Sequence, residues 1–503
     1  MIQTSLSSTH NERSLAMKPT PFQVLSDDEI RRIHQCTLDV LNDVGIFVEL
    51  KKMRNLLADH GCQVDETSRI VKFPPDVVEK LVGYAPREFT ICGADPNNQW
   101  TVSPDHRLWA GLGTAFRFLD PVTGAITNAT QDDVLKHIIL FNHLANITGS
   151  QMDIMAQDIP MHTIHVEAIR AWALNSGKSY GMGAYGVMAT QDMMEMCGMI
   201  MGGKDQLKER RPFCAIVSIP SPLGTSQVQL EGLMIMAELN QVAIVAPEAM
   251  AGTTAPVTLA GLLVQHNAEI VAHIVMTQAV NPGAPVMYGS VSTIADMRKG
   301  SAALGAAETG MISAASAQLG HFYGVPVRAV AGASESKTLD IQCGFERGQS
   351  MLQAALAGVN YVTCVGTLES SNMGVHDLDV IDNEIIGRVE RIMRGIEVND
   401  VSLAMDQIRK AGPHGNYLMD PFTRSNFRKE HFIPQVSDRE SLEGWEKSGR
   451  KGIKERAREA TEKILAEHQP RNLDPALIKE LDDYVASVSR RTEDDFKAAE
   501  WEA

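Results

Sequence analysis

The sequence predicts an α/β fold, a (β/α)8 barrel of the TIM type with helical N-terminal and C-terminal additions. From about residue 105 onward, short apolar segments alternate with long helices rich in Ala, Leu and Met. These segments are apolar throughout, as expected for parallel strands that are covered by helices on both faces. The 503 residues suffice for such a barrel, which needs about 250, and for further elements.

The chain begins with a Ser/Thr-rich stretch, residues 1–20, which we expect to be a flexible tail. This stretch contains no apolar run, so we do not expect it to be a signal peptide. Residues 21–104 are predicted to form a mainly helical N-terminal region. Its first helix should start after Ser26, because Ser26 and Glu29 have the spacing of a capping box.

The predicted barrel occupies residues 105–435. Its apolar strands are residues 152–157, 181–188, 213–219, 243–251, 285–291, 326–333 and 360–368. An eighth strand could come from residues 107–119. The helices between them are expected near residues 163–175, 190–202, 228–239, 258–280, 301–323, 344–358 and 380–395. A doubly wound open sheet is the alternative, but seven or eight units in one series favour the closed barrel.

Residues 436–503 are predicted to form a helical C-terminal extension. Ser437 and Glu440 have the spacing of a second capping box, and residues 447–468 are rich in Lys, Arg and Glu. Such a charged run is typical of a solvated helix face. The charged helical ends could also pack between the subunits of a homo-oligomer.

The net charge of −16 argues against nucleic acid and against an anionic membrane surface as partners. No uninterrupted apolar stretch has the length of a membrane span. The seven cysteines are far apart and form no C-x-x-C pair, which is typical of reduced thiols in a cytoplasmic protein. A negative field would also help to attract a cationic small molecule.

Motifs for common cofactors are weak or missing in the sequence. Residues 181–186 match G-x-G-x-x-G, but the glycines fall inside a predicted strand, so we reject dinucleotide binding. His162 and His165 form an H-x-x-H pair, yet a zinc site would need a third ligand, and we expect no metal. The phosphate-binding Walker loop does not occur.

In barrels of this kind, chemistry gathers at the carboxyl ends of the strands. The predicted strand ends supply a polar ring with several carboxylates and two tyrosines. Its members are Gln157, Asp158, Tyr185, Ser218, Ser221, Glu248, Tyr288, Ser290, Ser334, Glu335, Ser336, Glu369, Ser370 and His376. We expect some of these side chains only to cap the helices that follow. The ring indicates an enzyme that acts on a small molecule.

Several ordered blocks in the second half of the chain resemble segments of one family, the trimethylamine methyltransferases. The blocks are Gly332–Glu346 with its continuation to Asn360, Leu378–Ile385, Gly412–Leu418 and Pro434–Arg439. Blocks in a fixed order and at compatible spacing are much more specific than a single short motif. The resemblance implies transfer of a methyl group from an N-methyl compound to the Co(I) corrinoid of a partner protein.

The corrinoid is expected to be supplied by this cognate corrinoid protein. No histidine in the chain follows an aspartate at the spacing of the cobalamin-binding pattern D-x-H-x-x-G. We therefore expect this chain to bind no cofactor tightly by itself.

Family members that use trimethylamine carry pyrrolysine, which the resemblance places around Ala333 and Ser334, within residues 331–340. Only standard residues stand there, as in the non-pyrrolysine branch of the family. Displacement from a quaternary ammonium releases a neutral tertiary amine and needs no general acid, whereas a tertiary amine must first be activated. The expected substrate is thus a quaternary amine such as glycine betaine, with carnitine, proline betaine, γ-butyrobetaine and choline as alternatives.

The expected pocket holds the cation with aromatic faces and carboxylates, because a quaternary ammonium has no N–H donor. The aromatic candidates are Phe116, Tyr185 and Tyr288, and the carboxylate candidates are Glu248, Glu335 and Glu369. His376 or a strand-end serine such as Ser290 could bind the carboxylate of a betaine. No catalytic residue is assigned, because catalysis would come mainly from orienting one methyl group toward the cobalt.

Two alternatives stay open at this point. Lys337 or a neighbour could stand for a modified lysine, in which case the chain would demethylate trimethylamine. A barrel of the same kind could also bind quaternary amines without catalysing any reaction.

Overall fold

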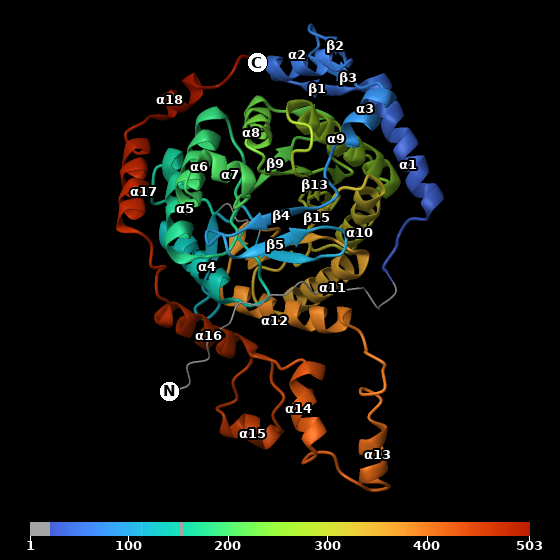
Figure 1. The fold of residues 1–503 in the computed structure, drawn as a ribbon, viewed down its shortest axis with the longest axis vertical. Helices are drawn as coiled ribbons and strands as arrows, with labels where there is room; N and C mark the ends of the chain where they lie inside the picture. Colours follow the sequence, from blue (N-terminus) through green and yellow to red (C-terminus); the bar gives the residue numbers. More distant parts are fainter. Residues whose placement is uncertain (1–20, 112, 151–153) are drawn as a thin grey trace.

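The computed structural model describes residues 21–111, 113–150 and 154–503, so the predicted N-terminal tail lies outside the described residues. A parallel sheet of six strands in the order β6-β16-β15-β13-β11-β9 forms its centre (Figure 1). The strands are β6 (Leu108–Gly111), β9 (Cys214–Ile219), β11 (Val242–Pro247), β13 (Val286–Ser290), β15 (Val327–Val330) and β16 (Tyr361–Val365). Each lies within or close to a strand predicted from the sequence.

Two further segments close this sheet into a barrel through single β-bridges. Gly149 bridges in parallel both to Ala110 of β6 and to Ser179. The segment that contains Ser179 then bridges to β9 through Gly183 and Ile216. The ring therefore has eight parallel positions in chain order, which confirms the predicted (β/α)8 barrel.

The second barrel position lies earlier in the chain than predicted. Residues 154–157 form no strand, and residues 152 and 153 of the predicted strand lie outside the described part of the chain. Gly149 takes this position, where a Cβ atom would lie only 2.0 Å from the Ser179 Oγ. Because the backbones approach so closely, this position requires a small residue, which a search for apolar runs misses.

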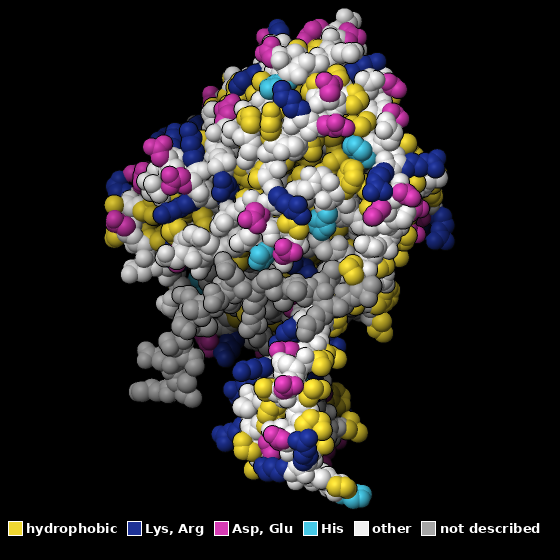
Figure 2. All heavy atoms as spheres, turned by 45° about the vertical axis from the view of Figure 1, so that its right-hand side comes forward, with side chains coloured by type: hydrophobic (Ala, Val, Ile, Leu, Met, Phe, Trp, Pro, Cys, Tyr) yellow, Lys and Arg dark blue, Asp and Glu magenta, His cyan; other side chains and the backbone are white. Residues whose placement is uncertain are grey.

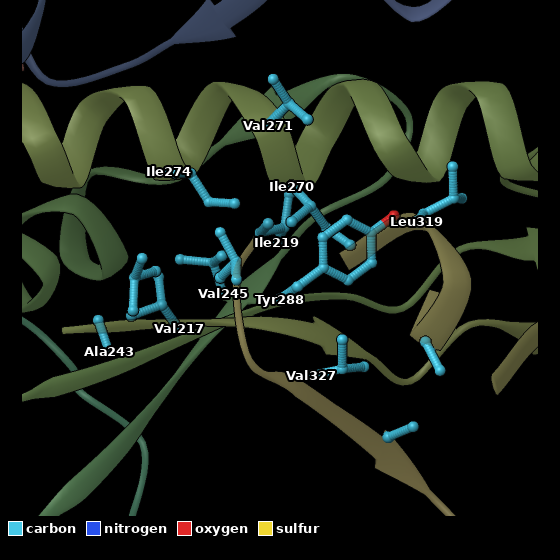
Figure 3. Close-up of a cluster of buried hydrophobic side chains, with 14 of the residues drawn as sticks. Val217, Ile219, Ala243, Val245, Ile270, Val271, Ile274, Tyr288, Leu319 and Val327 are labelled. Carbon is cyan, nitrogen blue, oxygen red and sulfur yellow. The ribbon is translucent and has the colours of Figure 1, made fainter. Parts of the chain in front are cut away.

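A helix follows each barrel position and covers the outside of the barrel. These helices are α4 (Gln131–His143), α5 (Ile164–Asn175), α6 (Val187–Met201), α8 (Gln227–Glu238), α9 (Leu259–Val280), α10 (Ala307–Phe322), α11 (Ile341–Ala357) and α12 (His376–Met393). Figure 3 shows Val245 and Val327 of the strands in one cluster with Ile270 of α9 and Leu319 of α10. By length and composition α9 could cross a membrane, but 72% of its apolar window is buried, as in a core helix.

A β-hairpin closes the amino ends of the barrel strands. It consists of β4 (Phe89–Cys92) and β5 (Gln99–Val102), which pair antiparallel and lie across the barrel in Figure 1. The cluster that fills this end contains Phe89, Ile91, Val102, Leu108, Ala110, Cys214, Ile216, Val242, Ile244, Ala246, Met287 and Tyr361. Apolar side chains therefore seal this end, which leaves the carboxyl ends of the strands as the route for a ligand.

Residues 21–82 pack on the outside of the barrel, and residues 21–104 as a whole hold more strand than predicted. Their elements are α1 (Asp27–Asp39), the π-helical turn η1 (Val40–Val44), β1 (Ile46–Val48), α2 (Lys51–Asp59), β2 (Gln63–Asp65), β3 (Ile70–Lys72) and α3 (Pro75–Val82), followed by the hairpin. The predicted capping box is present, since Ser26 and Glu29 satisfy each other's backbone N–H groups. A sheet in the order β10-β1-β3-β2 ties the region to β10 (Gly224–Thr225), in the loop after β9.

The remaining short elements lie in loops. They are β7 (Arg117–Leu119), β8 (Ile126–Asn128), η2 (Met161–Thr163), α7 (Lys204–Glu209), β12 (Met250–Ala251), β14 (Thr293–Ile294), β17 (Thr367–Leu368) and β18 (Met373–Gly374). A sheet in the order β17-β18-β7-β8 joins the loops that follow β16 and β6. Neighbouring loops at the carboxyl ends are thus bound to one another.

Three helices project from the barrel as an arm, formed by residues 396–450 (Figure 1). They are α13 (Met405–Ala411), α14 (Pro421–Glu430) and α15 (Leu442–Lys447), and none of their residues is buried. Hydrophobic side chains lie among charged ones on the face of the arm seen in Figure 2. Helix α15 is capped by Ser441, not by the predicted Ser437, whose backbone N–H instead donates to Glu384 at 3.2 Å.

The last helices run back along the barrel until the C-terminus lies beside α2 (Figure 1). They are α16 (Ile453–Glu467), α17 (Pro475–Val488) and α18 (Glu493–Ala498). Lys52 Nζ lies 3.7 Å from the centre of the Trp501 ring, a contact that joins the C-terminal segment to α2.

The buried Asp192 of α6 anchors this C-terminal segment. Its carboxylate accepts a hydrogen bond from Tyr484 at 2.7 Å and pairs with Arg491 at 2.8 Å and with His165 at 3.2 Å. Burial opposes ionisation, but these three partners outweigh it and hold the pKa of Asp192 below its ordinary value of 3.8. The ionised carboxylate therefore stabilises the docked state of α17.

We expect acid to release α17 from the barrel. The pKa of Asp192 is lower in the folded protein than its ordinary value of 3.8. The ionised carboxylate therefore stabilises the fold above pH 3.8, and this stabilisation is lost as the pH falls through the lower folded-state pKa. The protection factors of the amides in residues 475–488, taken relative to the intrinsic exchange rate at each pH, should fall as the pH is lowered below 3.8. Asp192→Asn should show fast exchange already at pH 7, with a loss of roughly 1–3 kcal/mol. Equal protection in both proteins at pH 7 would contradict this role.

Candidate active site

A buried arginine, the second residue of β15, occupies the barrel interior. Arg328 of β15 is fully buried, and its neighbours Val327 and Ala329 face the helices, so its side chain points inward. Its Nη1 donates to the Ser290 carbonyl at 3.1 Å. Its Nε and Nη2 have no hydrogen-bond partner among the residues that the structure describes.

Burial lowers the pKa of Arg328 to about 10, and the neighbouring Cys364, Tyr361 and Glu248 oppose this shift. The guanidinium is therefore still protonated at neutral pH. Arg328 was not among the residues predicted for the site, although a charged residue in the middle of an apolar strand is a visible signal.

Glu248 lies further out than Arg328 at the same end of the barrel. The strand registers place Ala246 of β11 and Gly289 of β13 level with Arg328, and Glu248 comes two residues after Ala246. The side chain of Glu248 is exposed. Gly289 must be glycine, because a Cβ atom there would lie 2.6 Å from the Val245 carbonyl oxygen. The interior beside Arg328 is thus free of a side chain from β13.

The loop after β15 is held by Glu346 of α11. The Ser334 hydroxyl donates to Glu346 at 2.6 Å, and the Glu335 backbone N–H donates to the same oxygen at 3.0 Å. Ala333 is buried among Val330, Cys364 and Leu304. The loop that contains Ala333 and Ser334 is therefore fixed in place and lies at the carboxyl ends of the strands.

The carboxylates of Glu335 and Glu369 belong to neighbouring loops. Glu335 accepts hydrogen bonds from the Ser370 hydroxyl at 2.6 Å and from the Gly305 N–H at 3.2 Å, so it links the loops after β13, β15 and β16. Glu369 is half-buried and has a left-handed backbone with φ of 51°. Its backbone N–H donates to the Ser336 carbonyl at 3.1 Å.

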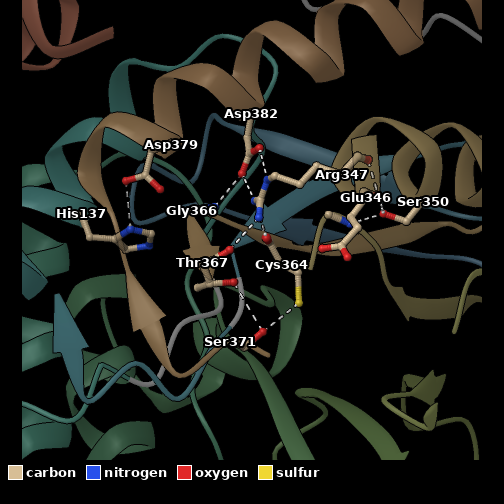
Figure 4. A network of polar contacts seen from close by, with 11 residues as sticks. His137, Glu346, Arg347, Ser350, Cys364, Gly366, Thr367, Ser371, Asp379 and Asp382 are labelled. Atoms are coloured by element: carbon tan, nitrogen blue, oxygen red, sulfur yellow. Dashed lines mark hydrogen bonds and ion pairs between the residues drawn. The ribbon is translucent and has the colours of Figure 1, made fainter. Parts of the chain in front are cut away.

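An ion pair behind this loop fixes the end of β16 (Figure 4). Arg347 of α11 pairs with Asp382 of α12, and both are fully buried. Its Nη1 and Nη2 donate to the carbonyls of Thr367 at 2.6 Å and Cys364 at 3.0 Å. Burial opposes the charge of Arg347, but the negative Asp382 outweighs it and raises the pKa of Arg347.

The structure corrects the predicted positions of Tyr288 and Ser290. Tyr288 faces the helices in Figure 3, where it is fully buried and its hydroxyl donates to Asn267 of α9 at 2.9 Å. Ser290 lies on the same face of β13, because side chains alternate along a strand. Neither side chain lines the barrel interior, although the Ser290 carbonyl contacts Arg328.

Tyr288→Phe should therefore change stability and leave the affinity for substrate unchanged. Loss of the hydroxyl leaves the Asn267 oxygen buried without that donor, which costs about 1–3 kcal/mol of unfolding free energy. Urea unfolding and substrate affinity, measured side by side, check this. Tyr84→Phe is the control, since Tyr84 is 42% exposed. A large rise in the Kd for the substrate in Tyr288→Phe would contradict this prediction and indicate that Tyr288 lines the pocket.

His376 also lies away from the barrel interior. It begins α12 and pairs with Asp133 of α4 at 3.1 Å, while its ring stacks on Phe118 at 4.7 Å. These residues line a hollow of about 410 Å³ that Arg458 of α16 also borders. The predicted role of His376 in binding a betaine carboxylate is corrected accordingly, because the side chain belongs to the helix layer.

The two other aromatic candidates lie in loops at the carboxyl ends. Phe116 is half-buried, and its backbone N–H donates to the Asn372 carbonyl of the loop after β16. Tyr185 is 46% exposed and its ring lies over Gly183, where a Cβ atom would be 2.0 Å from the ring. In the described part of the chain, no group of three His, Cys, Asp or Glu side chains could hold a metal ion.

A closed barrel with charged groups gathered at the carboxyl ends of its strands is the architecture of a (β/α)8-barrel enzyme. The family model described as trimethylamine methyltransferase (MTTB) matches residues 3–494. The chain therefore belongs to the trimethylamine methyltransferase family and is a methyltransferase, which confirms the resemblance seen in the sequence.

Curated relatives match this chain over almost its whole length. The glycine betaine methyltransferase of Desulfitobacterium hafniense (strain Y51) is 32% identical over 475 residues, which cover 92% of this chain and 97% of the relative. The trimethylamine methyltransferase MttB of D. hafniense (strain DSM 10664 / DCB-2) is 30% identical, with 94% and 95% covered. The monomethylamine methyltransferase MtmB of Methanosarcina barkeri, a solved structure, is 13% identical with a TM-score of 0.48 and covers 87% of this chain and 92% of its own.

Proposed function

We propose that this methyltransferase moves a methyl group from a quaternary amine to the Co(I) corrinoid of a partner protein in the cytoplasm. The similarity to a glycine betaine methyltransferase over 92% of the chain is the observation that carries the proposal. The corrinoid is the methyl acceptor and thus a substrate of the reaction. The electron pair of the broken C–N bond stays on nitrogen, and a neutral tertiary amine leaves.

The loop around Ala333 and Ser334 supports a quaternary amine over trimethylamine. This loop contains standard residues and is held by Glu346. Lys337 is exposed, and its Nζ donates back to the Glu335 carbonyl at 2.7 Å. The side chain of a modified lysine at position 337 would therefore leave the loop on its exposed side. Intact mass spectrometry should give the mass of the unmodified sequence, and an excess mass on residues 331–340 would favour trimethylamine.

The residues of this chain bind and orient the methyl donor. Glu248 offers a carboxylate for the positive nitrogen, and Phe116 and Tyr185 offer aromatic faces from the surrounding loops. Glu335 and Glu369 add negative charge to the rim of the same end. Since the leaving amine is neutral, no proton has to be supplied, and holding one methyl group toward the barrel entrance supplies the catalysis.

A substrate panel tests this proposal. The purified protein is mixed with a corrinoid protein reduced to Co(I) and with glycine betaine, carnitine, proline betaine, γ-butyrobetaine, choline or trimethylamine. Absorbance of the methylated corrinoid should appear with at least one quaternary amine and not with trimethylamine. Binding of a quaternary amine without methylation would indicate a non-catalytic binding protein and overturn the proposal.

A further inference from the structure

We propose that Arg328 binds a carboxylate of the substrate, so that the methyl donor is a zwitterion with a carboxylate close to its quaternary ammonium. This inference rests on the function proposed above and narrows its substrate class. The observation behind this inference is that Nε and Nη2, which form one edge of the Arg328 guanidinium, have no hydrogen-bond partner among the described residues.

The chain uses this same edge of arginine for carboxylates at two other places. Arg107 donates from Nε and Nη2 to the two oxygens of Glu390 at 2.8 and 3.1 Å. Arg347 binds both oxygens of Asp382 through the same two nitrogens. Two parallel N–H donors match the two oxygens of a carboxylate, which makes this arrangement strong and specific. Arg328 presents the same edge toward the barrel interior without a partner among the described residues.

Among the described residues, no negatively charged side chain lies within hydrogen-bond distance of the Arg328 guanidinium. Its Nη1 is bound to the Ser290 carbonyl, and the adjacent Tyr361 and Cys364 side chains are neutral at physiological pH. A fully buried guanidinium with unpaired donors is unfavourable in the free protein. A carboxylate ligand would accept hydrogen bonds from both donors and neutralise the positive charge. Because the guanidinium is already fixed in position, little entropy is lost on binding, and the affinity is higher.

The position of Glu248 gives the substrate a direction. Arg328 lies inside the barrel, and Glu248 lies two residues beyond that level, toward the entrance, on the strand two places away in the sheet. A zwitterion would place its carboxylate on Arg328 and its ammonium near Glu248. The N-methyl groups would then point toward the entrance, where the acceptor must approach.

The same charges discriminate against a simple cation. Choline carries the trimethylammonium group of glycine betaine but has a hydroxymethyl group in place of the carboxylate. It would leave the donors of Arg328 without an anionic partner and place its positive charge near the guanidinium. Glycine betaine and choline therefore form a matched pair of probes.

The test measures Kd for glycine betaine and choline by calorimetry on the full-length protein, in the wild type, Arg328→Met and Arg328→Lys. We expect wild-type protein to prefer glycine betaine, and Arg328→Met to weaken its binding about 100-fold without weakening the binding of choline, which no longer meets a like charge. Arg328→Lys should recover part of the loss, because lysine keeps the charge without the two-donor edge. Arg298→Met, at an arginine with a side chain that is 92% exposed, should bind like the wild type.

Thermal melting separates this role from a structural one. Without ligand, Arg328→Met should melt no lower than the wild type, because the variant loses an unpaired buried charge. Glycine betaine should raise the melting temperature of the wild type and not that of the variant. Unchanged betaine binding in Arg328→Met, or equal loss for both probes, would overturn the inference. Arg328-dependent betaine binding without methyl transfer would instead refute the proposed function and leave this inference standing.

Discussion

Arg347→Met should lower the free energy of unfolding by about 3–5 kcal/mol, because it leaves Asp382 buried without its counter-ion. The carbonyls of Thr367 and Cys364 lose their donors at the same time. The loop after β16 would then lose its support, so methyl transfer should fall together with stability. Urea unfolding followed by circular dichroism measures the first effect, and the methyl-corrinoid assay measures the second.

Two variants separate the ion pair from side effects of the substitution. Arg347→Met combined with Asp382→Leu removes both charges and should recover much of the stability that the single change loses. Arg409→Met breaks an ion pair whose side chains are 70% and 89% exposed, and should cost less than about 1 kcal/mol. If Arg347→Met were as mild as Arg409→Met, the buried pair would not be what fixes the end of β16.

Glu248→Gln should raise the Kd for glycine betaine about 100-fold. Removal of one negative charge at roughly 6 Å from the ammonium, at the effective dielectric constant of about 20 that suits protein sites, costs about 3 kcal/mol. Each factor of ten in affinity corresponds to about 1.4 kcal/mol. Because glutamine keeps the size of the side chain, the change reports mainly on charge. Calorimetry gives Kd, and the methyl-corrinoid assay gives kcat and KM.

Glu238→Gln is a matched control on the outside of the barrel. Glu238 ends α8 and pairs with Lys52 at 3.8 Å, so its loss should leave the affinity for betaine unchanged. An increase in KM without a change in kcat would show that Glu248 acts on binding. A Kd within twofold of the wild type for Glu248→Gln would remove this carboxylate from the pocket.

The barrel could be predicted because its strands are buried on both faces. Runs such as Val242–Pro247 and Tyr361–Val365 are almost entirely apolar, and this pattern requires helices on the outside and a filled interior. Because both faces of each strand are apolar, the sequence does not show which side chains face the barrel interior. In β13 both faces are apolar, so nothing in the sequence shows that Tyr288 faces the helices and Met287 the interior.

The errors at the other positions have different physical causes. The second barrel position depends on a close backbone approach at Gly149, which leaves no apolar signature. Arg328 does not follow from the rule that polar site residues come directly after the strands, because its long side chain starts within β15. Loop positions such as those of Glu248 and Glu335 could be predicted because polar residues at strand ends follow directly from the fold.

In the proposed reaction, the hairpin that seals the amino ends of the strands also constrains the order in which the two substrates bind. Amine and corrinoid partner would have to use the same entrance, so the amine must bind before the partner docks. Two-substrate kinetics should accordingly be compulsory-ordered, with the tertiary amine released only after the methylated partner departs. Excess partner at low amine concentration should slow turnover, because a docked partner traps the empty barrel.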